Sequence, residues 1–192
     1  MPELEDIVRQ IRGCHGCGLA EGRTNAVPGE GPENSDLMFI GEGPGFYEDK
    51  QGRPFVGSSG HFLEELLASI DLSREQVYIT NMVKCRPPNN RDPYPGEVGA
   101  CSQYLDGQIS LINPKVVVTL GRHSLSRFLP GETIGKARGK PRRMDGFTLY
   151  PIYQYPIYHP AAALHRQSLR QVVEEDFKVI LILLAEHPPQ VR

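Results

Sequence analysis

The segment Val116-Val117-Val118-Thr119-Leu120 decides the fold class of this chain. It is a continuous, mostly β-branched apolar run, and Gly121 ends it. A short apolar run of this kind, closed by a turn residue, is typical of a strand buried on both faces of a parallel sheet. We therefore expect this segment to form a central strand.

Three further extended segments are spread along the chain. Residues 37–40 and 77–80 are short apolar runs, and residues 147–158 have extended character. Segments with apolar residues at intervals of three or four separate them, which indicates helices. Strands that alternate with helices predict an α/β fold, here a three-layer αβα sandwich around a mainly parallel four-stranded sheet. We expect residues 1–192 to form one domain.

The composition is ordinary for a globular protein, with 39% hydrophobic and 23% charged residues in 192. The longest apolar run, residues 179–185, is too short to cross a bilayer, and the N-terminus does not resemble a signal peptide. We therefore expect a cytoplasmic monomer. The formal net charge of -2 gives no overall basic footprint for nucleic acid, although a total charge does not report a local patch.

The four cysteines suggest a metal site. Cys14 and Cys17 form a C-x2-C pair, whereas Cys85 and Cys101 are far away in the sequence. Cysteines in the cytoplasm are more often metal ligands or free thiols than disulfides, and four thiolates can hold either zinc or an iron–sulfur cluster. A redox-active pair and unrelated structural thiols are the alternatives. The spacing does not separate zinc from iron–sulfur.

Polar or glycine-rich residues follow the ends of three of the expected strands. These are Gly41-Glu42, Asn81 and His159. Ligands of such sheets bind beyond the carboxyl ends of the strands, so we expect a pocket there. The glycine-rich loop after Gly41 matches neither the dinucleotide fingerprint nor a P-loop, and a turn-rich connection with solvated acids is its alternative. Phe55 in this loop is either a local core residue or a flat surface on which a base stacks.

An ordered set of short motifs resembles the family 4 uracil-DNA glycosylases, from about Cys14 to the final helix. The motifs are Gly41-Glu42-Gly43-Pro44-Gly45, Gly52-Arg53-Pro54-Phe55-Val56-Gly57, Ile79-Thr80-Asn81, Val83-Lys84-Cys85-Arg86-Pro87-Pro88 and His159-Pro160. The resemblance implies an enzyme of base excision repair that flips uracil out of DNA, single- or double-stranded, and hydrolyses its N-glycosidic bond. It also implies a [4Fe–4S] cluster on the four cysteines.

The resemblance assigns roles to six pocket residues, namely Glu42, Glu48 and His159 in catalysis and Gly43, Phe55 and Asn81 in uracil binding. In this scheme Phe55 stacks on the flipped base and Asn81 reads its polar edge. Glu42 is the main catalytic carboxylate, Glu48 lines the same pocket, and His159 contacts the leaving base.

DNA contacts are expected outside the pocket as well. The basic loop at residues 135–143 is the best local phosphate footprint, and a solvated loop is its alternative. Leu164 is expected either to enter the minor groove where the base left or to pack in an ordinary way. The expected DNA-binding residues are Lys136, Arg138, Lys140, Leu164 and Arg166.

The chain departs from the family pattern at two places. Phe46 and Tyr47 stand where family members often carry acids, which makes the assignment of Glu48 weaker than that of Glu42. The echo Tyr-Pro-Ile-Tyr at residues 150–153 and 155–158 lengthens the approach to His159. A slipped strand there would displace His159 or bring Gln154 into the pocket.

Two rival functions belong to other classes. An iron–sulfur electron carrier or redox sensor would explain the cysteines but not Phe55, Asn81 and His159 at the strand ends. A non-catalytic or covalent binder of uracil-DNA is the second rival. Covalent relatives carry a histidine in a basic loop after the second strand, and residues 86–92 contain none.

Overall fold

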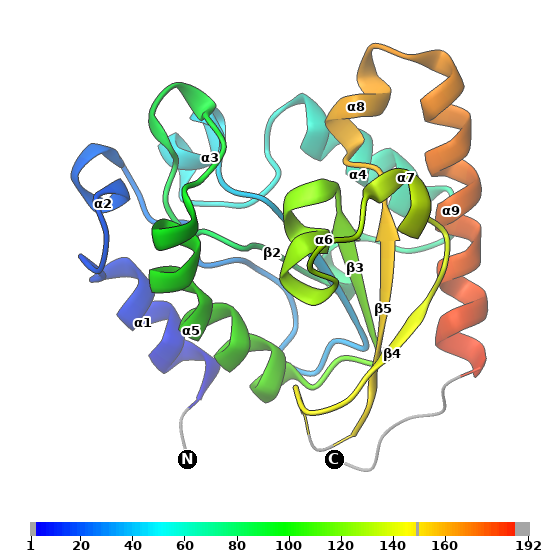
Figure 1. Cartoon of the computed structure of the whole chain (residues 1–192), viewed down its shortest axis with the longest axis horizontal. Coiled ribbons are helices and arrows are strands. Elements are labelled where there is room, and N and C mark those ends of the chain that lie inside the picture. The colour runs from blue at the N-terminus through cyan, green and yellow to red at the C-terminus, as the bar shows by residue number, and fades with distance from the viewer. Residues whose placement is uncertain (1–2, 149, 187–192) are drawn as a thin grey trace.

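The valine run forms the central strand β3 (Val116–Leu120), as predicted. The computed structural model describes residues 3–148 and 150–186 (Figure 1). Strands β1 (Leu37–Gly41) and β2 (Tyr78–Asn81) extend the sheet on one side of β3, and β5 (Ile152–Ile157) extends it on the other. All three of these pairings are parallel, and the order across the sheet is β2-β1-β3-β5-β4.

The fifth strand corrects the prediction of four strands. Strand β4 (Arg142–Met144) pairs antiparallel with β5 at the edge of the sheet. The sequence predicts a basic loop here, because a three-residue segment with two arginines has no apolar alternation. Charged residues are common on edge strands, where they discourage pairing with other chains. The same stretch also holds the short helix α7 (Ile134–Ala137).

Helices and short 3-10 segments connect the strands. In chain order the other elements are α1 (Leu4–Arg12), α2 (Leu19–Gly22), α3 (Phe46–Gln51), α4 (Ser58–Ala68), η1 (Arg74–Gln76), η2 (Pro88–Asn90), α5 (Pro95–Ile112), α6 (Arg122–Phe128), α8 (Pro160–Leu164) and α9 (Gln167–Glu186). Among the described helices, none is both long and apolar enough to span a bilayer.

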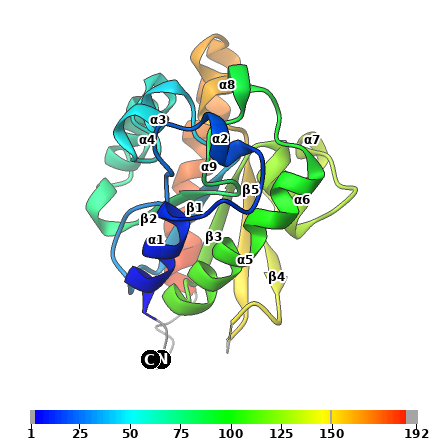
Figure 2. The ribbon, with the colours of Figure 1, turned by 90° about the vertical axis from the view of Figure 1, so that its left-hand side faces the viewer.

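The alternation of side chains along β1 builds the three predicted layers. Leu37 and Phe39 face the core shared with α4 and α9, where the rings of Phe39 and Phe177 stack with centroids 5.7 Å apart. Met38 and Ile40 face the opposite core, shared with α5. Figure 2 shows α5 in front of the strands and α9 behind them. The αβα sandwich is thus confirmed.

The parallel arrangement brings the carboxyl ends of four strands to one edge. The strands end there at Gly41, Asn81, Leu120 and Ile157. Helix α8 begins directly after the end of β5 and lies beyond the sheet at this edge (Figure 1). Residues far apart in the sequence therefore meet at one place.

Candidate active site

A cavity of about 480 Å³ opens at the carboxyl edge of the sheet. All six predicted pocket residues line it. The complete lining is Glu42, Gly43, Pro44, Gly45, Glu48, Phe55, Ser59, Asn81, Pro87, Asn90, Arg91, His159, Ala161 and Ala162. The parallel sheet thus brings the residues that follow its strand ends to one pocket.

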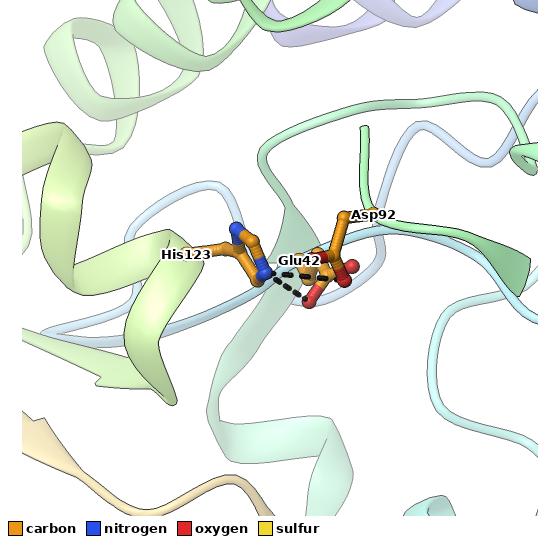
Figure 3. Close-up of side chains that lie close together, drawn as sticks. All are labelled: Glu42, Asp92 and His123. Carbon is orange, nitrogen blue, oxygen red and sulfur yellow. Dashed lines mark ion pairs between the residues drawn. The ribbon is translucent and has the colours of Figure 1, made fainter. Parts of the chain in front are cut away.

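Glu42 follows β1 and faces a histidine that the sequence reading missed. One oxygen of its half-buried carboxylate lies 3.6 Å from Nε2 of His123, and an oxygen of Asp92 lies 3.3 Å from the same nitrogen (Figure 3). Burial raises the pKa of Glu42; His123 and Arg122 act to lower it, and Asp92 acts to raise it. A carboxylate held at the pocket wall in this way can accept a proton or stabilise a nearby cation.

Glu42, Asp92 and His123 form a cluster that we call the His123 cluster. Nothing in the sequence connects the segments that carry Asp92 and His123. His123 lies in α6 just after β3, and Asp92 lies in the loop before α5. Arg122 donates to Asp92 over 2.7 Å, and its Nε lies 2.9 Å from His123 Nε2. The ligand atoms of Glu42, Asp92 and His123 all lie within 4.8 Å of one another, a spacing that a metal ion could use. The Arg122 guanidinium supplies positive charge at the same place.

Glu48 has a different environment from Glu42. One of its oxygens accepts hydrogen bonds from the backbone N–H groups of Val56 and Gly57, both at 2.9 Å. The other oxygen accepts from the N–H of Gly45 at 3.1 Å. Three backbone donors therefore engage this carboxylate, which ties α3 to the loop that carries Phe55.

Phe55 is held in a strained conformation at the pocket. Its φ of 51° lies in the left-handed region, and its side chain is only 5% exposed. The carbonyl oxygen of Phe55 accepts a hydrogen bond from the guanidinium of Arg74 at 2.7 Å. Gly60 approaches the same carbonyl so closely that a Cβ at position 60 would clash with it. The Phe55 ring stacks on the imidazole of His159, with centroids 5.7 Å apart. Such strain is maintained only where surrounding contacts fix it.

Asn81 presents a side-chain amide to the cavity. The residue is 2% exposed, and no described residue forms a hydrogen bond with this amide. Gly41 makes the arrangement possible, because a Cβ there would clash with Asn81 Oδ1 and would lie 2.7 Å from the ring of Phe55. The amide is thus free to pair with a ligand, since a buried polar group needs a partner.

His159 caps the start of α8 and points its other nitrogen away from the cap. Its Nδ1 accepts a hydrogen bond from the N–H of Ala161 at 3.1 Å, so in the neutral ring Nε2 carries the proton. Burial lowers the pKa of His159 to about 4, against an opposing effect of Glu48. The imidazole is therefore neutral at pH 7 and can donate from Nε2.

The repeated Tyr-Pro-Ile-Tyr segment does not displace His159. Residues 152–157 of this segment form β5, which pairs with β3 in continuous register, and His159 follows at the carboxyl ends of the strands. Gln154 is fully buried and donates to Thr119 Oγ1 at 2.6 Å. It is not among the residues that line the pocket.

Comparison with known proteins agrees with this geometry. Residues 28–180 match the sequence profile of the family described as the Uracil DNA glycosylase superfamily. The chain belongs to this superfamily. It is similar to the type-4 uracil-DNA glycosylase of Sulfurisphaera tokodaii, with 51% identity over 94% of this chain and 84% of the relative. It is also similar to the type-4 enzymes of Archaeoglobus fulgidus (46% identity; 98% and 97% covered) and Thermotoga maritima (46% identity; 92% of each).

Cys14, Cys17, Cys85 and Cys101 all line one small cavity, which is separate from the active-site pocket. Donors point at their sulfurs: Arg23 Nη1 lies 3.1 Å from Cys85 Sγ, and the N–H of Lys84 lies 3.3 Å from Cys101 Sγ. Among the described residues, no three of these sulfurs lie within 4.8 Å of one another.

The expected DNA-binding residues of the glycosylase fold lie in different environments. Lys136, Lys140 and Arg166 are exposed. Arg138 instead forms an ion pair with the buried Asp176 at 2.7 Å, so its charge is already engaged. Leu164 ends α8 and is 37% exposed, on the helix whose first turn lines the pocket.

Proposed function

We propose that this chain is a uracil-DNA glycosylase that removes uracil from DNA by hydrolysing its N-glycosidic bond, in base excision repair. The observation that carries this proposal is the convergence of Phe55, Asn81, Glu42 and His159 on one cavity. Type-4 uracil-DNA glycosylases at 40–51% identity support it. The enzyme acts as a monomer on single- or double-stranded DNA.

Recognition of the flipped base needs a flat face and a matched polar edge, because a base in a duplex is out of reach of the chemistry. Phe55 supplies the face. The Asn81 amide offers one donor and one acceptor, which complement O4 and N3–H of uracil. Cytosine has the opposite pattern at this edge and leaves the amide unpaired. Gly43 lines the cavity with its backbone, and a Cβ there would lie only 2.7 Å from the side chain of Val83.

Hydrolysis develops positive charge on the sugar and negative charge on the leaving base. Water adds to C1′ of the sugar and loses one proton to solvent, and uracil leaves with the electron pair of the broken bond and takes up a proton after release. Glu42 orients the water and stabilises the oxocarbenium-like sugar, while His159 donates from Nε2 to uracil O2. Glu48 acts at the same site by fixing the loops that carry Gly45 and Phe55, through its backbone hydrogen bonds.

We further propose that Cys14, Cys17, Cys85 and Cys101 hold a [4Fe–4S] cluster. Their common cavity and the donors at their sulfurs support this assignment. When bound, the cluster would link the C-x2-C segment, the end of β2 and α5, and hence has a structural role. Neither glycosidic bond cleavage nor base recognition requires it.

The DNA backbone is proposed to follow the exposed cations Lys136, Lys140 and Arg166. Leu164 then enters the space that the flipped base leaves, as apolar wedges do. The main role of Arg138 is its ion pair with Asp176, which anchors the loop to α9. Its attraction for a DNA phosphate is the smaller contribution.

A denaturing gel tests the activity. Wild type, Glu42→Ala and His159→Ala are each incubated with one uracil-containing oligonucleotide and with its thymine counterpart. We expect alkali-labile sites in the uracil strand only, and a rate lower by about 10²-fold in each variant. A heat-stable protein–DNA adduct would assign the chain to the covalent binders. A redox protein would leave both strands intact.

A further inference from the structure

Two large aromatic side chains stand exposed beside the pocket. Phe46 and Tyr47, in the first turn of α3, are 43% and 58% exposed, and their rings meet edge to face with centroids 5.4 Å apart. Both lie between Gly45 and Glu48, which line the cavity. Adjacent exposed aromatic residues are unusual on a free surface and mark places where a ligand or partner binds.

Two cations accompany these rings. Lys50 Nζ lies 4.7 Å from the ring centroid of Phe46, and the Arg86 guanidinium lies 5.2 Å from it. Arg86 also donates to Asn90 Oδ1 at 2.7 Å, and Asn90 lines the pocket. Arg86 therefore links the cavity wall to the aromatic pair.

We propose that Phe46 and Tyr47, with Lys50 and Arg86, form a stacking subsite for an unpaired base next to the flipped uracil in the same strand. This inference rests on the proposed function. Aromatic rings combined with cations are the usual surface for single-stranded nucleic acid, because every base has a π-face and every nucleotide a phosphate. Tyr47 lies against the loop of Phe55, since a Cβ at Gly57 would meet its ring at 3.6 Å.

The subsite gives the enzyme a preference for single-stranded DNA. In a duplex, the base beside the lesion is already stacked and paired, and must be released before it can reach these rings. In a single strand the same base is available at little cost. The aromatic pair therefore contributes to binding of single strands more than to binding of duplexes.

The test uses 2-aminopurine next to a non-cleavable 2′-fluoro-deoxyuridine, in a single strand and in a duplex. Wild type is expected to quench the single-strand fluorescence on binding, because the probe stacks on the rings. The double variant Phe46→Ala/Tyr47→Ala should lose this quenching and bind the single strand about 5-fold more weakly or worse, with a smaller loss for the duplex. Phe46→Trp should retain both properties.

Ile182→Ala, which removes an exposed apolar side chain on α9, is the matched control and should behave like wild type. In Ile182→Ala, single-turnover uracil release at saturating enzyme should also equal that of wild type, because this residue lies outside the pocket and the subsite. Wild-type quenching and affinity in the double variant would overturn the subsite, as would equal losses on both substrates. Absence of uracil release from wild type would instead refute the proposed function.

Discussion

An oxygen of Glu42 lies 3.6 Å from Nε2 of His123, across the gap between the ends of β1 and β3. Burial raises the pKa of Glu42, and the neighbouring imidazole acts against that rise. Of the other neighbours, Arg122 acts to lower this pKa and Asp92 acts to raise it. The protonation of the proposed catalytic carboxylate therefore depends on a residue that does not line the pocket.

The first prediction concerns the acid limb of the pH–rate profile for single-turnover cleavage. A carboxylate with a raised pKa takes up its proton at higher pH, so single-turnover cleavage should fall at a pH above the ordinary glutamate range of about 4.3. His123→Asn removes the imidazole that acts to lower the pKa of Glu42, and should move this fall to still higher pH. His61→Asn, at an exposed position of α4, is the control. An unmoved acid limb in His123→Asn would contradict the coupling.

The second prediction concerns base choice. Asn81→Asp replaces the amide donor with a carboxylate, so the hydrogen bond to uracil O4 is lost and the edge of cytosine becomes the better partner. We expect slower uracil release and measurable cytosine release, because mismatched buried polar groups discriminate strongly. The measurement is cleavage of matched uracil and cytosine oligonucleotides by wild type and variant. Unchanged uracil activity would show that another group reads the base.

The third prediction concerns stability. The folded protein lowers the pKa of His159 from 6.5 to about 4, so between these values the unfolded chain binds more protons. The free energy of unfolding must then decrease as pH falls from about 6.5 to about 4. His159→Gln should show a shallower decrease over this window in urea titrations at several pH values. Parallel curves for the two proteins would mean that His159 titrates normally when folded.

The fourth prediction concerns the cysteines. Anaerobically purified protein should be brown and contain iron, and Cys85→Ser should unfold at a temperature lower by about 5 °C or more, because a lost ligand weakens a link between distant segments. Wild type stripped of metal by a chelator is the control and should unfold like the variant. Stoichiometric zinc without iron would refute the cluster.

Features that a short run of neighbouring residues specifies by itself could be predicted from the sequence. The valine run of β3 specified a buried parallel strand, and parallel strands bring Glu42, Asn81 and His159 to one edge whatever the details of the loops. Phe55 required the resemblance, because a phenylalanine in a loop is as compatible with a core as with a pocket. Its left-handed φ has no signal in the sequence.

Other features depend on contacts that only the fold creates. Asp92 and His123 meet because the loop before α5 approaches the first turn of α6, and no sequence spacing connects them. The position of His123 just after a strand end was a usable signal. Strand β4 was missed because two arginines at a sheet edge look like a solvated loop. The backbone hydrogen bonds of Glu48 likewise depend on how α3 folds back on the loop before α4.

The most direct test of the central claim is the identity of the released base. Wild-type protein is mixed in excess with a uracil-containing oligonucleotide, and the free base is identified and counted by mass spectrometry. The proposed function predicts one free uracil for each oligonucleotide, with an abasic strand left behind and no thymine released from the control. An intact uracil strand, or uracil DNA retained as a covalent adduct, would contradict it.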